Sequence, residues 1–97
     1  MVPNYRTVTI SGAANENLVP KIYEQLKTEG YTTSRFVLDF VGFEADEGTS
    51  FKINGNPLKV PSTGTFYSPF NTSGDFLAIS SLTFDEAVDD MDLYIIY

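Results

Sequence analysis

The chain has 97 residues, which suffices for one domain with a modest core and is too short for a large enzyme fold. Six Lys and Arg residues against 13 Asp and Glu residues give a formal net charge of -7, which disfavours binding to nucleic acid or to an anionic membrane. His, Cys and Trp are absent, and this excludes imidazole bases, thiol nucleophiles, disulfides and the common zinc and haem ligands. We therefore expect no enzymatic activity and no cofactor.

The hydrophobic pattern predicts a single domain, 1-97, with a helix-containing half at 1-44 and a hairpin-rich β half at 45-97. No run approaches the roughly eighteen apolar residues that span a bilayer. The expected fold class is α+β and mainly β, with one amphipathic helix on a small antiparallel or mixed β-sandwich.

In the first half, Val8 and Ile10 alternate with Thr residues and predict a strand from Tyr5 to Ile10. The segment 15-29 has apolar residues at helical spacing, and its start and end match Asn15 or Asn17 as an N-terminal cap and Gly30 as a left-handed C-terminal cap. A strand from Arg35 to Phe43 is apolar on both faces, so we expect it to be central. The strand-helix-strand order allows the two strands to be parallel.

In the second half, Asn54-Gly55 predicts a type I′ turn between Phe51-Ile53 and Leu58-Val60. Pro57 and Pro61 place the return strand at a sheet edge, and a short strand follows at 65-67. In the strand expected at 76-84 the apolar alternation slips at Ser80-Ser81, which predicts a β-bulge. An acidic loop at 85-92 then leads to a strand at 93-97.

The acidic loop contains weak calcium candidates, Asp85, Asp89, Asp90 and Asp92, because calcium prefers several carboxylate oxygens. Their spacing differs from that of an EF-hand loop, and a solvated acidic connection is the alternative interpretation. Catalysis is not expected: Ser80 and Ser81 have no histidine partner in the chain.

Aromatic and apolar residues supply the other candidates. Tyrosines at four positions, Tyr5, Tyr31, Tyr67 and Tyr97, suit either a carbohydrate-stacking platform or packing in a core or interface. The apolar end of the sequence must be covered by its own sheet or by a neighbouring subunit. The expected interface residues come from the two most apolar strands: Phe36, Leu38, Phe40, Tyr94, Ile95, Ile96 and Tyr97.

Three stretches, 51-67 (FKINGNPLKVPSTGTFY), 79-84 (ISSLTF) and 93-97 (LYIIY), together resemble a module of tailed-bacteriophage virion proteins. The resemblance covers about the last half of the chain and carries no catalytic residue. It implies a structural component of a virion that decorates or is attached to the capsid or tail. The implied partners are copies of the chain, with a trimer as one arrangement, and the major capsid or tail proteins. The alternative is a carbohydrate- or receptor-binding fibre module, with or without calcium.

Overall fold

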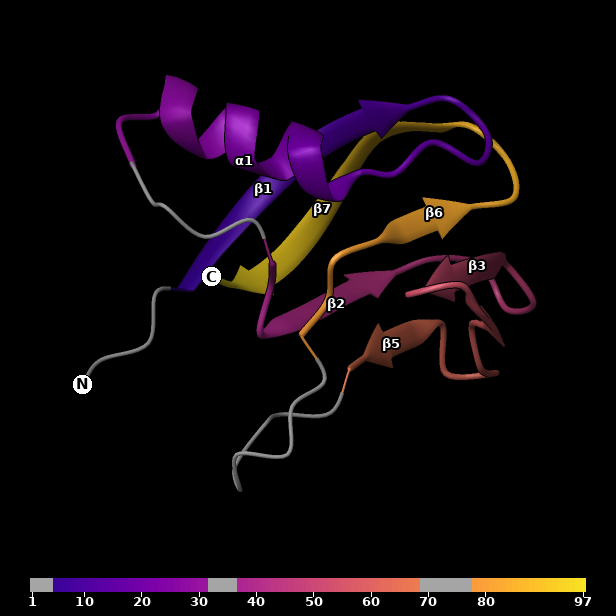
Figure 1. The fold of residues 1–97 in the computed structure, drawn as a ribbon. Helices are drawn as coiled ribbons and strands as arrows, with labels where there is room; N and C mark the ends of the chain where they lie inside the picture. The colour runs from indigo at the N-terminus through magenta and orange to yellow at the C-terminus, as the bar shows by residue number, and fades with distance from the viewer. Residues whose placement is uncertain (1–4, 32–36, 69–77) are drawn as a thin grey trace.

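The computed structural model describes residues 5–31, 37–68 and 78–97, which form one helix and seven strands (Figure 1). In chain order the elements are β1 (Tyr5–Gly12), α1 (Val19–Thr28), β2 (Phe40–Glu44), β3 (Ser50–Ile53), β4 (Asn56–Lys59), β5 (Thr65–Tyr67), β6 (Leu82–Phe84) and β7 (Val88–Ile96). The strands form a four-stranded sheet of order β1-β7-β2-β5 and a three-stranded sheet of order β4-β3-β6. All the named pairings are antiparallel.

The four-stranded sheet is built around β7, which pairs with β1 on one side and with β2 on the other. Because both neighbours are antiparallel to β7, β1 and β2 run in the same direction, as the strand-helix-strand order allows. They are not paired, however, since β7 lies between them. Strand β2 has both faces buried from Phe40 to Phe43, so its predicted central character is confirmed.

Only one face of the four-stranded sheet is covered by other described elements. Val8 and Ile10 of β1 are buried on that face and belong to the same core cluster as the apolar residues of α1. Further along the same face, Phe43 of β2 contacts Phe51 and Phe84 of the three-stranded sheet. Helix and small sheet therefore form one layer and the four-stranded sheet the other, which confirms the expected mainly-β sandwich.

Helix α1 begins at Val19 after Leu18 at the N-cap position, four residues later than the predicted start at 15, and it ends at Thr28 with Gly30 in the predicted left-handed position. The Asn17 side chain accepts a hydrogen bond from the Val19 backbone amide at 3.1 Å, which satisfies one free amide of the first turn. At the other end Gly30 has φ of +92°, its amide donates to the Lys27 carbonyl, and the Tyr31 amide donates to the Leu26 carbonyl. These two bonds define a Schellman cap.

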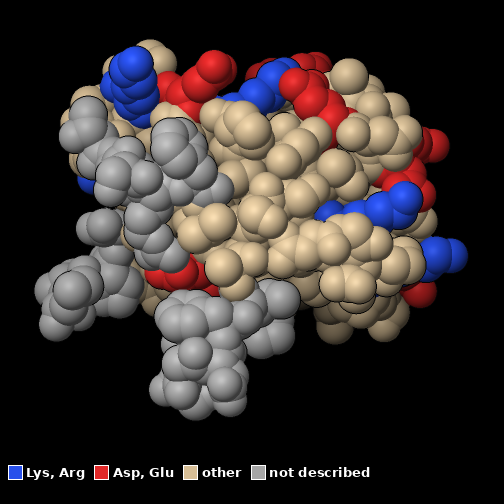
Figure 2. All heavy atoms as spheres, viewed as in Figure 1, with Lys and Arg blue, Asp and Glu red and all other residues tan. Residues whose placement is uncertain are grey.

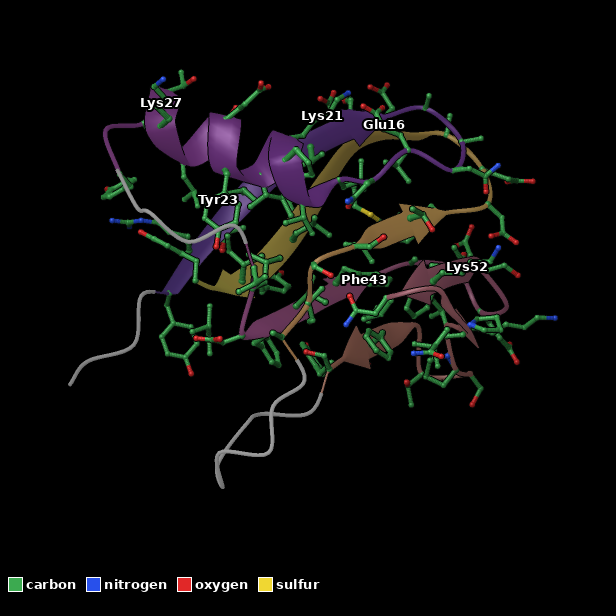
Figure 3. All side chains as sticks on the ribbon, viewed as in Figure 1. Glu16, Lys21, Tyr23, Lys27, Phe43 and Lys52 are labelled. Carbon is green, nitrogen blue, oxygen red and sulfur yellow. The ribbon has the colours of Figure 1, made fainter. Side chains whose placement is uncertain are left out.

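The connection between β1 and α1 is held by a pair of charged side chains at the start of the helix (Figure 3). Glu16 accepts a hydrogen bond from the Ala13 amide at 3.0 Å and lies 3.2 Å from the Lys21 ammonium group. Lys21 also donates to the Ser11 carbonyl at 2.9 Å. The Ala13 amide and, to a smaller extent, Lys21 lower the pKa of the Glu16 carboxyl below the ordinary value for glutamate.

The predicted hairpin is present between β3 and β4. Asn54 and Gly55 have φ values of +52° and +81°, as a type I′ turn requires, and β4 is an edge strand as its prolines predict. Phe51 and Ile53 are buried, whereas Leu58 opposite Phe51 is 37% exposed. The buried partner on the return side is Val60.

The slip in alternation at Ser80-Ser81 marks a change of sheet, so the predicted bulge is corrected. Before the slip, Ile79 forms a two-bond bridge with Leu38, next to β2 of the four-stranded sheet. After the slip, Leu82 pairs with Ile53 of the three-stranded sheet. Ile79 and Leu82 are both fully buried in the same core cluster, Ile79 from its isolated bridge with Leu38 and Leu82 from β6. We call the segment 79-82 the crossing.

The acidic segment is also corrected, because most of it is strand. Strand β7 begins at Val88, and the turn that precedes it is short. Two residues of β7, Asp89 and Asp90, lie opposite the single residue Ser11 of β1, so the bulge occurs here. Asp90 has φ of +46°, its amide donates to the Ser11 hydroxyl, and that hydroxyl donates to the Asp89 carboxylate.

A cluster of four phenylalanine rings joins the two sheets. Phe43 and Phe66 come from the four-stranded sheet, and Phe51 and Phe84 come from the three-stranded one. Ring centroids are 5.0 Å apart for Phe43 and Phe51, 5.1 Å for Phe43 and Phe84, and 4.8 Å for Phe51 and Phe66. These three contacts are edge-to-face, the arrangement that the ring quadrupole favours.

Replacing Phe43 with Ala should lower the free energy of unfolding by about 3 to 5 kcal/mol, because it leaves a cavity between the sheets. The half-exposed Leu58→Ala is the control and should change it by less than about 1 kcal/mol. Denaturant titration measures both. Equal midpoints for the two variants would contradict the assignment of Phe43 to the centre of the core.

Gly55→Val should destabilise the protein by about 1 kcal/mol or more, because a β-branched residue is strained at a φ of +81°. The control is Thr83→Val in β6, where the chain is extended and a β-branched residue already stands. A denaturation midpoint for Gly55→Val that equals that of the unaltered protein would argue against the type I′ turn.

The Glu16 carboxyl should titrate below the ordinary value for glutamate when it is followed by NMR. Because the folded-state pKa is lowered, the stabilisation that Glu16 provides is present above the unfolded-state pKa and is lost as pH falls through the folded-state value. Lys21→Met should raise the Glu16 pKa only part of the way, since the Ala13 amide remains. A complete return of the Glu16 pKa to the ordinary value for glutamate would show that Lys21 is the larger cause.

Candidate binding face

The candidate site is the face of the four-stranded sheet that points away from α1, which we call the outer face. Directly opposed residues of antiparallel strands share a face, so the pairing register assigns its members. They are Tyr5, Thr7 and Thr9 of β1, Asp92, Tyr94 and Ile96 of β7, Phe40, Gly42 and Glu44 of β2, and Thr65 and Tyr67 of β5.

One end of the outer face is aromatic. The first row across the sheet is Tyr5, Ile96 and Phe40. The next row continues from Thr7 through Tyr94 and Gly42 to Tyr67. The three tyrosines are 57%, 38% and 56% exposed in the order β1, β7, β5, whereas Phe40 and Ile96 are almost fully buried. Three accessible rings are thus attached to two adjacent rows of a rigid sheet.

Gly42 fixes the position of the Tyr67 ring. A Cβ atom at Gly42 would lie only 2.5 Å from Cδ1 and 2.9 Å from Cε1 of Tyr67, so the ring occupies the space that a side chain would take. The ring is also nearly parallel to that of Phe40, with an interplanar angle of 13° and centroids 6.2 Å apart. Tyr67 therefore lies against the sheet and presents its other side to solvent.

The opposite end of the outer face is acidic. Asp92 is exposed and accepts a hydrogen bond from the Thr9 hydroxyl at 2.6 Å, and Glu44 is exposed on β2. The described outer-face residues include no Lys or Arg. The described basic residues lie elsewhere: Arg6, Lys21, Lys27, Lys52 and Lys59. Figure 2 has the same view as Figure 1 and so shows the side of α1 and the three-stranded sheet, where Lys and Arg lie among Asp and Glu along the top and right of the molecule.

An open groove of about 640 Å³ lies beside the acidic end. Five acidic residues contribute to its lining: Glu44, Asp46, Asp85, Glu86 and Asp89. The apolar residues Phe84, Val88 and Met91 also line the groove. The groove joins the loop after β2 to the turn before β7, and its negative charge adds to that of Asp92.

The calcium candidates are not gathered into a cluster. Within the described ranges, no three Asp, Glu, His or Cys side chains are placed so that they could hold a metal ion. Asp89 and Asp92 instead accept hydrogen bonds from Ser11 and Thr9 of the neighbouring strand. Asp85 lies in the turn before β7, where it lines the groove.

Most of the expected interface residues lie inside the protomer. Leu38 and Ile95 are 0% exposed, and Phe40 and Ile96 are 7% and 6% exposed. Their own sheet thus accounts for their apolar character, and they have almost no area to offer a partner. Tyr94 is accessible, and Tyr97 is partly buried against the core. Phe36 lies outside the described residues.

The four tyrosines of the expected platform are divided between two faces. Tyr5 and Tyr67 share the outer face, where Tyr94 joins them. Tyr31 follows α1 on the covered side of the sheet, and its ring lies 3.6 Å from the guanidinium carbon of Arg6. The alternation of β7 could have indicated Tyr94 as a platform residue, because Tyr94 points away from the buried Leu93 and Ile95.

No protein-family model, curated protein or solved structure was found to match this chain. In the part of the chain that the structure describes, no helix is long and apolar enough to cross a membrane.

Proposed function

We propose that this protein is a structural component of a phage virion that attaches to a capsid or tail surface through its outer face. The observation that carries the proposal is the set of three exposed tyrosines, Tyr5, Tyr67 and Tyr94, on one flat face of the sheet. The sequence resemblance of residues 51-67, 79-84 and 93-97 supplies the virion context. Copies of the chain and the major capsid or tail proteins are the proposed partners.

Tyrosine is well suited to such an attachment. It buries a large rigid ring at a small cost in side-chain entropy and keeps a hydroxyl that can form hydrogen bonds, and it is enriched in protein interfaces. Here the strands hold the positions of all three rings, and Phe40 and Gly42 also hold the orientation of Tyr67. A partner would therefore meet a surface that needs little rearrangement before binding.

The acidic end of the outer face adds a charge requirement. Among residues 5–31, 37–68 and 78–97, Asp92 and Glu44 have no basic neighbour on this face, so a partner that covers them gains by bringing Lys or Arg. Attachment should then weaken as salt is added, because exposed charges are screened.

The second candidate function is a carbohydrate- or receptor-binding fibre module. The same tyrosines favour it, since a flat ring can stack on a sugar, and Asp92 and Glu44 could accept hydrogen bonds from sugar hydroxyls. A competition experiment distinguishes the two functions. A soluble sugar should displace a carbohydrate ligand from the outer face, but it should not displace a capsid or tail protein.

The test compares Tyr94→Ser with Tyr31→Ser, which are the same change at tyrosines of almost equal exposure, 38% and 36%, on opposite faces. The readout is co-sedimentation of the protein with virus particles purified from cells that carry the gene. Tyr94→Ser should weaken attachment about 10-fold or more, as expected for an interface residue of about 2 kcal/mol. Tyr31→Ser should leave attachment unchanged.

Denaturation midpoints of both variants establish that each remains folded. Absence of the unaltered protein from the particles would contradict the virion assignment, whereas equal attachment by both variants would contradict the outer face as its site. Displacement by soluble sugars, with binding to a glycan array that Tyr94→Ser abolishes, would replace the first function by the second. Light scattering of the free protein, with calcium and with a chelator, tests the proposed self-association separately.

A further inference from the structure

The side chain of Asn54 connects the hairpin turn to the crossing. Its Oδ1 atom accepts hydrogen bonds from the Ser80 amide at 3.0 Å, the Ser81 amide at 3.2 Å and the Ser80 hydroxyl at 3.2 Å. Its Nδ2 atom donates to the Ala78 carbonyl at 2.9 Å. The carboxamide group is therefore held at both ends although the residue is exposed.

The same residue precedes Gly55, and an Asn-Gly pair is chemically labile. The Gly55 backbone nitrogen can attack Cγ of Asn54 and form a new N–C bond, while the Cγ–Nδ2 bond breaks. The proton of the Gly55 amide is taken up by the solvent, and a solvent proton leaves with the departing nitrogen as ammonia. Water then opens the cyclic imide to aspartate or isoaspartate. Glycine permits the attack because it has no side chain to obstruct it.

We propose that Asn54 is a deamidation site that the fold masks and that reacts only when the crossing opens. Attack requires the Gly55 nitrogen to come within about 3 to 3.5 Å of Cγ with the correct alignment. A carboxamide that turns toward its own backbone to reach that geometry leaves its hydrogen-bond partners in the segment 78-81. This turn breaks the bonds to Ala78, Ser80 and Ser81, which hold the group in its present plane.

An opposing effect is present in the same contacts. Three donors directed at Oδ1 stabilise negative charge on that oxygen, which is the charge that develops during attack. The donors accelerate the reaction only if the attack geometry is reached while they remain bound. The bond from Nδ2 to the Ala78 carbonyl opposes this, because it fixes the plane of the group and retains the leaving nitrogen. Masking should therefore exceed activation.

The first experiment needs no variant. The protein is incubated at mildly alkaline pH, folded or unfolded in guanidinium chloride, and conversion at Asn54 is followed by peptide mass spectrometry. In the folded protein the deamidation rate should be lower than in the unfolded protein by a factor of at least about 10, because the reaction must wait for a local opening of the structure. Equal rates would overturn the masking. A faster reaction in the folded protein would also overturn it and would show that the donors to Oδ1 act as a catalytic oxyanion site.

The second experiment tests whether opening of the crossing is the motion that allows Asn54 to deamidate. Leu82→Ala removes a fully buried side chain at the end of the crossing, and Leu58→Ala changes the same hairpin on its exposed return strand. The first should increase both the deamidation rate and the hydrogen exchange of the Ser80 and Ser81 amides by a similar factor, and the second should change neither. Faster exchange at Ser80 and Ser81 with unchanged deamidation would overturn the proposal.

Discussion

The contact between the two sheets through Phe43, Phe51, Phe66 and Phe84 is the interaction on which the rest of the structure depends. The three-stranded sheet contains strands of three and four residues, which are too short to be stable without a partner surface. It becomes ordered by placing its rings against those of the larger sheet. Because this sheet and α1 both use the same face of the larger sheet, neither covers the outer face, where Tyr5, Tyr67 and Tyr94 are exposed although Phe40 and Ile96 are buried.

Strand β7 turns this one-sided packing into a site. Its position between β1 and β2 places Leu93 and Ile95 in the core, and the alternation of the strand then places Tyr94 outside. The neighbouring strands contribute Tyr5 and Tyr67 in register, although they are far apart in the sequence. The aromatic surface is thus a consequence of pairing between distant segments, and a change of register by one residue would bury the rings.

Local signals in the sequence predict local structure well. Helix α1, its Gly30 cap and the Asn54-Gly55 turn depend on neighbouring residues, and the structure contains them. The helix starts later than predicted, with Leu18 at the N-cap position, and Asn17 accepts hydrogen bonds from the Val19 amide and from the distant Leu82 amide. The crossing and the acidic part of β7 could not be obtained in this way. Ser80 and Ser81 change sheets because Asn54 bonds to their amides, and Asp89 and Asp90 form a bulge because Ser11 lies opposite them. Both contacts join residues that are distant in the sequence.

The same reasoning explains why four of the residues expected at an interface, Leu38, Phe40, Ile95 and Ile96, are buried within the molecule, whereas Tyr94 is exposed. Leu38, Ile95 and Ile96 are more apolar than any tyrosine, and for that reason the protomer buries them first. The outer face instead exposes amphipathic and charged groups: tyrosine rings with a hydroxyl, of which one occupies the space over a glycine, and carboxylates that have no basic neighbour among the described residues of that face. A binding surface of a stable small domain is best sought among residues that are stable when exposed to water and whose desolvation on binding costs little free energy. Tyr5, Tyr67 and Tyr94 meet that condition, and the buried aliphatic residues do not.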